Sequence, residues 1–305
     1  MKPRFVSSLV AASLLAMMLG PVHAQAQAPA KVEIKDDLGH TTQWSRPPQR
    51  IVTLLPSLTE TVCALGACER LVGVDRYSNF PEAVNKLPKL GGLDDTQVET
   101  IVSLRPDVVL LAPSSRVTDR LRSLGLTVVT LEAKSYADVQ RVLDKIGALL
   151  QVRDAQAVWR RIDALVGAAA QSIPPQARGT LVYYEVDRSP YAAGPVSFMG
   201  ETMTRLGLRN IITPEMGPFP KISPEYVVRA APQLIMIGKR NADGLFQRPG
   251  WDRIPAIREQ RVCVFDAQQS DVLARPGPRM GEAAQIMAQC LREQSSSSSS
   301  SKKAR

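Results

Sequence analysis

Short runs of consecutive apolar residues alternate with amphipathic stretches along most of the chain. The runs predict buried strands at 50–55, 71–74, 108–111, 126–131, 180–186, 234–237 and 261–266. Apolar residues three or four positions apart predict helices at 59–65, 117–124, 139–150 and 154–170, and a last helix from residue 280. Strands separated by helices are typical of parallel, doubly wound sheets, so the pattern predicts an α/β protein.

One unit of this pattern occurs twice. VETIVSLRPDVVLL at 98–111 matches PEYVVRAAPQLIMI at 224–237 in register, with Glu99 opposite Glu225 and Pro106 opposite Pro232. The helix at 154–170, for which Asp154 is a suitable cap, lies between the two copies. The sequence therefore predicts two doubly wound, Rossmann-like α/β lobes, at 31–152 and 179–294, bridged by a single long helix at 153–173.

The two ends of the chain differ from the rest. Lys2 and Arg4 precede an apolar stretch at 5–19 and a small-residue pattern, as in a cleavable signal peptide at 1–26. Cleavage after Ala24 or Ala26 fits this pattern and predicts an exported, soluble protein; an uncleaved N-terminal membrane anchor is the alternative. The other end, 295–305, is rich in serine and basic residues, and we predict that it is a disordered tail.

The net charge argues against nucleic-acid binding. The chain has 38 Lys and Arg against 29 Asp and Glu, but five of the basic residues lie in the two ends. The predicted folded part keeps only a small positive excess, and no basic stripe interleaved with aromatic residues is present in the sequence.

Residues for catalysis are sparse. His40 is the single histidine after the predicted signal peptide, which excludes a multi-histidine zinc site and weakens a Ser-His-Asp triad. No phosphate-binding glycine motif occurs, and we predict no metal site. Ser57 follows a predicted strand, as a nucleophile elbow would, but lacks the flanking glycines and a base. An exported serine hydrolase using Ser57 is thus the alternative to a binding protein.

Four cysteines in an exported chain predict disulfides. Three pairings are possible, and four buried thiols are the alternative. Cys63 and Cys68 flank Gly66, close enough for a local bridge, and Cys263 and Cys290 would then form the second one.

Long loops with aromatic and small residues follow several predicted strands. Ligands of open α/β sheets bind beyond the carboxyl ends of the strands, so two facing lobes would surround a small ligand with these loops. The loops lie at 75–81, 91–95, 188–198, 217–223 and 269–279.

Several of these segments together resemble a known family. DDLGH, PPQRIVTLLPSLTETVCALGA, LVGVDRYSNFP, LPKLGG and VETIVSLRPDVVLL look like the periplasmic binding proteins of metal-chelate ABC importers, and the likeness spans about 32–291. The resemblance implies a class III binding protein fold and a monomer in the periplasm without enzyme activity. It also implies a cobalamin, haem or ferric siderophore ligand, and as partners an inner-membrane permease dimer with its ATPase.

The resemblance gives Glu99 and Glu225 a role. Members of the family use one glutamate on each lobe to engage arginines of the permease, and the motifs place these glutamates at Glu99 and Glu225. A local explanation competes with docking. Thr96 and Glu99 have the spacing of a capping box, and Glu225 follows Ser223 in a first helical turn.

The resemblance also narrows the ligand. The haem-binding branch has an iron-ligating tyrosine after the glycine of an LPKVGY-like stretch, and here Gly92 stands there, so haem loses its main support. Tyr77 matches a cavity tyrosine of cobalamin binders, and the 271–279 loop resembles theirs at Asp271, Arg275, Pro278 and Arg279. Gly92 and Leu93, however, stand where a cobalamin binder has a cavity tryptophan. Cobalamin is the predicted ligand, with a ferric siderophore as the alternative because Arg275, Arg188 and Arg116 suit an anion. The predicted site comprises Tyr77, Gly92, Leu93, Asp94, Tyr191, Phe219, Asp271 and Arg275.

Overall fold

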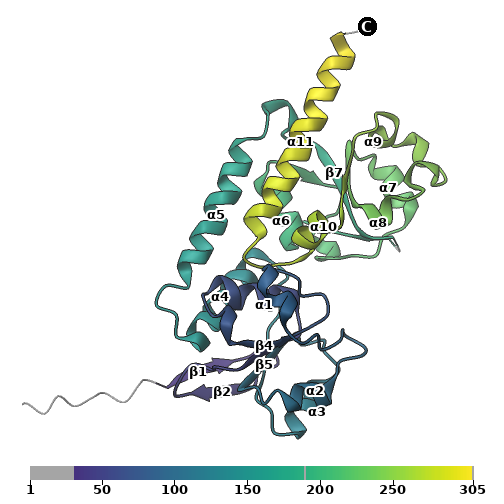
Figure 1. Ribbon diagram of the computed structural model, residues 1–305. Coiled ribbons are helices and arrows are strands. Elements are labelled where there is room, and N and C mark those ends of the chain that lie inside the picture. The colour runs from purple at the N-terminus through teal and green to yellow at the C-terminus, as the bar shows by residue number, and fades with distance from the viewer. Residues whose placement is uncertain (1–30, 189, 304–305) are drawn as a thin grey trace, which may run out of the picture. The chain divides into compact units, whose positions relative to one another are not determined.

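The computed structural model describes residues 31–188 and 190–303 (Figure 1). The predicted signal peptide at 1–26 lies outside the described residues. Within the described ranges, no helix is both long and apolar enough to cross a bilayer.

The N-terminal lobe is built on a parallel sheet with the strand order β4-β3-β5-β6. Its strands are buried apolar runs, as the pattern predicts: β3 (Ile51–Thr53), β4 (Leu71–Val74), β5 (Val108–Leu111) and β6 (Val128–Thr130). Its helices are α1 (Pro56–Ala64), α2 (Val98–Ser103), α3 (Thr118–Ser123) and α4 (Tyr136–Leu150). Short 3-10 turns lie at Cys68–Arg70 and Glu82–Lys86.

An antiparallel hairpin of β1 (Val32–Lys35) and β2 (Thr41–Trp44) precedes this sheet and was not predicted. Asp36, buried in its turn, accepts hydrogen bonds from the backbone N–H groups of Leu38 and His40 and from Thr130 of β6. Burial raises the pKa of Asp36, but these hydrogen bonds together lower it by more than burial raises it. The pKa of Asp36 therefore lies below its ordinary value. A charged Asp36 therefore fastens the hairpin to the edge of the sheet.

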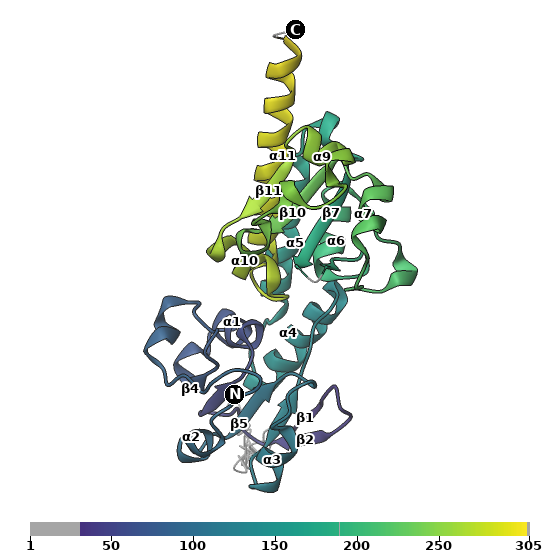
Figure 2. The same cartoon turned by 90° about the vertical axis from the view of Figure 1, so that its right-hand side faces the viewer.

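The C-terminal lobe repeats the topology of the first. Its parallel strands run in the order β9-β7-β10-β11, as β4-β3-β5-β6 do in the N-terminal lobe, and β8 adds an antiparallel pair to β7. Figure 2 shows β7, β10 and β11 side by side. The strands are β7 (Leu181–Asp187), β8 (Tyr191–Ala192), β9 (Arg209–Asn210), β10 (Leu234–Gly238) and β11 (Val262–Phe265). The helices are α6 (Phe198–Arg205), α7 (Pro224–Ala230), α8 (Lys239–Ala242), α9 (Pro255–Arg258), α10 (Ala267–Ala274) and α11 (Met280–Lys303). Further 3-10 turns lie at Pro175–Ala177, Pro214–Met216, Leu245–Gln247 and Trp251–Arg253.

The repeated sequence unit is a repeated structural unit. α2 leads to the central strand β5, and α7 leads to the central strand β10. Arg105 and Ala231, the matching residues before Pro106 and Pro232, both have a positive φ, of 46° and 49°. The two copies thus share a backbone turn that residues other than glycine rarely adopt.

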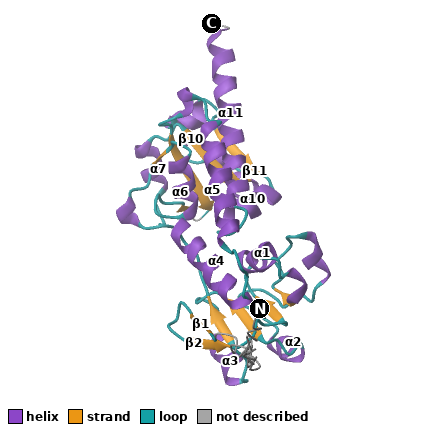
Figure 3. Ribbon diagram, turned by 90° about the vertical axis from the view of Figure 1, so that its left-hand side faces the viewer, coloured by secondary structure: helices purple, strands orange, loops and turns teal. Residues whose placement is uncertain are grey.

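A bridging helix, α5 (Gln156–Gln171), follows α4 and packs against α11 (Figures 1 and 3). Asp154 is not the cap that the sequence predicts, because the N-cap of α5 is Ala155, which makes no side-chain cap bond. Asp154 lies one residue earlier, where its Oδ1 accepts the Ala157 N–H at 3.1 Å. Apolar residues on both helices join the core of the C-terminal lobe to that of the N-terminal lobe. One continuous buried cluster includes Leu58 of α1, Ile146 of α4, Ile162 of α5 and Met287 of α11.

The opposite face of each sheet has its own buried cluster. Val109, Ile101 and Leu121 belong to the cluster in the N-terminal lobe, and Ile235 and Trp251 to the one in the C-terminal lobe. Both sheets are therefore covered on two faces, which is the doubly wound arrangement that the sequence predicts.

The serine-rich end differs from the prediction. The sequence predicts disorder from residue 295, whereas α11 continues to Lys303 and Ser295 is buried. The Ser295 hydroxyl donates to the Leu291 carbonyl at 2.7 Å. Extending a helix that already exists costs far less free energy than starting one, so serines that follow a packed helix can continue it.

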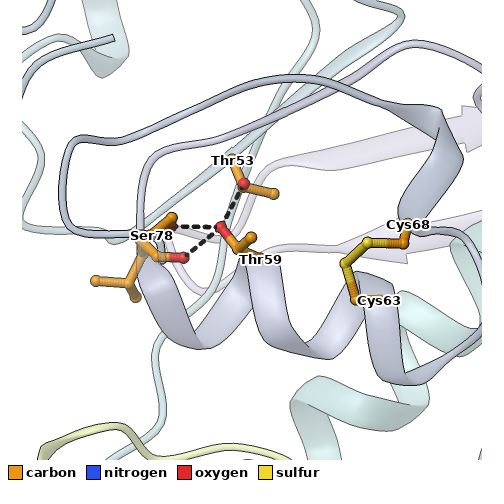
Figure 4. Close-up of a disulfide and its surroundings, with 6 residues drawn as sticks. Thr53, Thr59, Cys63, Cys68 and Ser78 are labelled. Atoms are coloured by element: carbon orange, nitrogen blue, oxygen red, sulfur yellow. Dashed lines mark hydrogen bonds between the residues drawn. A yellow bond between two sulfur atoms is a disulfide. The ribbon is translucent and has the colours of Figure 1, made fainter. Parts of the chain in front are cut away.

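The two disulfides pair as predicted. Cys63 and Cys68 close the turn after α1 (Figure 4), and Cys263 and Cys290 join β11 to α11. Each bridge lies within one lobe, so neither connects the lobes covalently.

Candidate functional site

The loop after β4 presents an exposed tyrosine. Asp75 Oδ1 accepts the backbone N–H groups of Tyr77 at 2.8 Å and Ser78 at 3.1 Å, and Asp75 Oδ2 accepts the Ser78 hydroxyl. Burial raises the pKa of Asp75, and these hydrogen bonds offset only part of that shift. The backbone is held from within the lobe, while the Tyr77 ring stays 60% exposed.

A chain of buried hydroxyls supports this loop from behind. Thr59 Oγ1 lies 2.7 Å from both Ser78 Oγ and Thr53 Oγ1, which links the loop to α1 and β3 (Figure 4). The Lys89 ammonium donates to the Ser78 carbonyl, and burial lowers the pKa of Lys89 against the opposing effect of Asp75. Buried networks in which each group has a partner fix a single conformation.

The glycine-containing loop before α2 packs on the same tyrosine. Gly92 N donates to Asp95 Oδ1 at 2.8 Å, Arg76 pairs with Asp95, and Arg76 N donates to the Gly91 carbonyl. A Cβ on Gly92 would lie 3.2 Å from Tyr77 Cε2, so a larger residue would push on the ring. The structure thus brings Gly92 and Tyr77 together.

Leu93 and Asp94 project from the same loop. Leu93 is 57% exposed, and Asp94 lies 3.5 Å from Arg116 in an ion pair that is open to solvent. Four of the predicted residues, Tyr77 and Gly92 to Asp94, therefore form one surface of the N-terminal lobe.

The aromatic residues predicted on the C-terminal lobe behave differently from each other. Tyr191, on the short strand β8, is 40% exposed, and its backbone forms an isolated antiparallel β-bridge with Lys221. Phe219 packs edge-on against Phe198, with ring centroids 6.0 Å apart, and contacts the apolar core. Tyr191 has area available to a ligand, and much of Phe219 serves packing.

Arg275 lies in a different setting from the one predicted. The sequence predicts a loop at 269–279, but Asp271 lies within α10 and Arg275 is the C-cap of this helix. A capping box of Asp266 and Gln269 starts the helix. Arg275 is only 8% exposed. Its Nη1 donates to Glu60 and Asn79 at 2.9 and 2.7 Å. Its Nη2 donates to the Tyr77 carbonyl at 3.0 Å and lies 2.8 Å from Asp271. Both terminal nitrogens of the guanidinium are thus engaged by protein oxygens.

Glu60 is a residue that the sequence did not single out. It lies on α1, is 2% exposed, and accepts two further hydrogen bonds from Arg279, at 2.8 and 3.0 Å. Arg275 and Arg279 are 215 and 219 residues away along the chain, so no local sequence pattern predicts this contact. The helical pattern does not mark Glu60 either, because α1 is buried at every position from Ser57 to Val62.

The two predicted docking glutamates are exposed in the first turns of α2 and α7. Ser223 caps α7 by accepting the Tyr226 N–H, and the backbone N–H of Glu225 with the Ser223 hydroxyl lowers the pKa of Glu225. The capping box predicted at α2 is wrong. Thr96 donates its hydroxyl to the Gly92 carbonyl, and Gln97 is the N-cap without a side-chain bond.

Ser57 has no catalytic surroundings. It is buried in the first turn of α1, and a Cβ on Gly277 would lie 3.5 Å from the Ser57 carbonyl oxygen. His40 contacts Asp36 and Arg122 at the hairpin turn. Across 31–188 and 190–303, no cluster of three or more His, Cys, Asp or Glu side chains could hold a metal ion.

Known proteins resemble this chain over most of its length. A family model described as periplasmic binding protein matches residues 51–269. An uncharacterized ABC transporter substrate-binding lipoprotein of Bacillus subtilis, YvrC, is 28% identical over 279 residues, which is 85% of each chain. The vitamin B12-binding protein of Vibrio vulnificus is 25% identical over 245 residues, 76% of this chain and 86% of that protein. A solved periplasmic haem-binding protein from Pseudomonas aeruginosa is 27% identical, with a TM-score of 0.65, covering 79% of this chain and 91% of the other.

Proposed function

Because the chain belongs to the periplasmic binding protein family, we propose that it captures cobalamin in the periplasm and delivers it to an ABC importer. Members of this family bind and hand over substrates for transport and are not enzymes. The fold is that of the class III binding proteins, with two α/β lobes and a helix between them. The ligand-specific part of the proposal rests on the residues of the site.

One observation carries the choice of ligand: Glu60 and Asp271 compensate the charge of Arg275, so this arginine offers no unpaired cation to an anionic ligand. Tyr77, Leu93 and Tyr191 supply exposed aromatic and aliphatic area. Large apolar walls with a few polar groups suit a macrocycle with amide side chains, such as a corrinoid, better than a multiply charged ligand. The likeness to proteins named vitamin B12-binding supports the same choice.

A ferric siderophore is the second candidate. Arg116 beside Leu93 is widely exposed, and its only ion-pair partner in the described residues is the equally exposed Asp94. Such a guanidinium can turn toward an anionic chelate at little cost in free energy. Haem is less well supported, because Gly92 occupies the place of the iron-ligating tyrosine.

Titration of the purified protein with cyanocobalamin, haemin and a ferric tris-catecholate, followed by calorimetry, tests the proposal. Cyanocobalamin should bind with a micromolar or lower Kd and the other two more weakly. Leu93→Ala should weaken cobalamin binding about tenfold, because burying a leucine side chain contributes about 1.5 kcal/mol. Leu124→Ala is the matched control, because Leu124 is also exposed (41%) but ends α3 at the opposite edge of the sheet.

Absence of cobalamin binding, or tighter binding of haemin or the catecholate, would overturn the choice of cobalamin. Equal losses of cobalamin affinity in Leu93→Ala and Leu124→Ala would show that the loop carrying Leu93 is not part of the binding site.

A further inference from the structure

A buried junction of charges joins the two lobes at Glu60. Glu60 extends from α1 of the N-terminal lobe, and Arg275 and Arg279 come from the 275–279 segment that follows α10 of the C-terminal lobe. The side chains of Glu60, Arg275 and Arg279 are 1%, 8% and 11% exposed. Both Glu60 oxygens accept from arginine, and Oε1 accepts from both arginines. We call this set, with Asp271 and Asn79, the Glu60 junction.

The Glu60 junction holds the loop that carries Tyr77 through hydrogen bonds. Arg275 donates to the Tyr77 carbonyl and to Asn79 Oδ1, and Asn79 Nδ2 donates to Asp271 Oδ2 at 2.9 Å. Asp75 holds the Tyr77 N–H from the other side. The backbone of Tyr77 is therefore held at both its N–H and its C=O, while its ring remains exposed.

The two arginines of the junction are compensated by carboxylates. Arg275 and Arg279 face Glu60 and Asp271, and Arg279 also lies 3.9 Å from Glu282, which is 48% exposed. Away from bulk water, charges interact more strongly than at the surface. An uncompensated charge in the junction would therefore change the affinity for a charged ligand lying on Tyr77.

We propose that Glu60 is a positioning and specificity-determining residue of the binding site. By holding Arg275 across the lobes, it fixes the Tyr77 loop for the ligand, and by compensating the arginines it keeps the site from favouring anionic chelates. This inference rests on the proposed function, since it concerns the ligand that the site accepts.

A second contact between the lobes provides a matched control. Glu201 of α6 accepts the backbone N–H of Tyr136 at the start of α4, and Phe198 N donates to the Lys134 carbonyl at 2.7 Å. Glu201 thus ties the lobes together as Glu60 does, but through a backbone N–H in place of guanidinium groups. Glu201→Gln removes the same charge from a contact between the same lobes, without releasing Arg275.

The experiment measures the affinities of full-length Glu60→Gln and Glu201→Gln for cyanocobalamin and for a ferric tris-catecholate. One uncompensated charge roughly 10 Å from an anion changes its affinity about tenfold near a protein surface. Glu60→Gln should shift the catecholate-to-cobalamin affinity ratio at least about tenfold toward the anion, and the shift should shrink in high salt. Glu201→Gln should leave the ratio within about twofold of wild type.

Two further variants separate positioning from charge. Glu60→Gln combined with Arg275→Met restores the balance but removes the clamp on Tyr77, so the ratio should return to the wild-type value while cobalamin affinity stays low. If Glu60→Gln does not fold, Asp271→Asn, at the half-exposed edge of the junction, should shift the ratio in the same direction by a smaller amount.

An unchanged ratio in Glu60→Gln, or in Asp271→Asn where the former does not fold, contradicts the inference. A ratio in Glu201→Gln that moves as far as in Glu60→Gln also contradicts it, since loosened lobes would then suffice. Failure of the wild type to bind either ligand instead overturns the proposed function.

Discussion

Individual backbone positions show how closely the two lobes correspond. Arg105 and Ala231 each end a short helix with a positive φ, directly before a proline and a buried strand. A left-handed conformation costs a non-glycine residue about 1–2 kcal/mol. The turn is adopted twice nonetheless, because it places Val108 and Leu234 at the start of the central strands.

Replacing Ala231 with glycine should relieve this strain. We expect Ala231→Gly to raise the free energy of unfolding by about 1 kcal/mol, since the relief exceeds the added entropy of the unfolded chain. Ala230→Gly, one residue earlier and inside α7, should lower it by about 1 kcal/mol. Urea denaturation of both variants measures the difference, and a loss of stability in Ala231→Gly would contradict the assignment of strain.

The candidate site could be predicted only where neighbouring residues define it. Tyr77 and Gly92 to Asp94 lie on loops next to buried strands, and the sequence pattern located these loops. The setting of Arg275 depends on Glu60, which is 215 residues away. Contacts at such a separation leave no periodic trace, so the family resemblance identifies Arg275 and Asp271, but no sequence pattern identifies Glu60.

At the level of elements, burial decides what the sequence reveals. β5 and β10 are continuous apolar runs, buried on both faces, and were predicted. The hairpin of β1 and β2 is half exposed and held by Asp36, so its strands lack such a run. α10 was missed because it is short and carries mostly polar residues before Val272.

The two disulfides should differ in how much they stabilise. Cys263–Cys290 closes a loop of 27 residues and Cys63–Cys68 one of 5. Loop entropy predicts losses in unfolding free energy of about 3.5 kcal/mol for Cys263→Ala with Cys290→Ala, and about 2 kcal/mol for Cys63→Ala with Cys68→Ala. Urea denaturation under non-reducing conditions compares the two, and an equal or reversed order would show that strain or denatured-state structure outweighs loop entropy.

In the whole molecule, the duplicated topology gives the two glutamates equivalent places. Glu99 and Glu225 are exposed in the first turns of helices that lead to the central strand of each sheet. Glu99 makes no capping box with Thr96, so its local contribution to helix stability is limited to its place in the first turn of α2. One carboxylate per lobe suits a partner with two-fold symmetry, as a permease dimer would be.

Reversing these two charges should separate transport from binding. Glu99→Arg with Glu225→Arg should abolish uptake of the ligand in cells and leave its affinity in solution unchanged, because like charges would meet at the permease. Glu33→Arg with Glu259→Arg changes the charge equally, at one exposed glutamate in each lobe, and should preserve uptake. Normal uptake by the Glu99 and Glu225 variant would exclude both residues from docking.

The disulfide connectivity has a consequence for how the molecule matures. The first cysteine pairs with the second and the third with the fourth, so native bridges join neighbours in chain order. A polypeptide that enters an oxidising compartment N-terminus first exposes Cys63 and Cys68 together, long before Cys263 appears. If the chain is exported in this order, consecutive oxidation gives the native pairing directly, without an isomerase to rearrange mispaired cysteines.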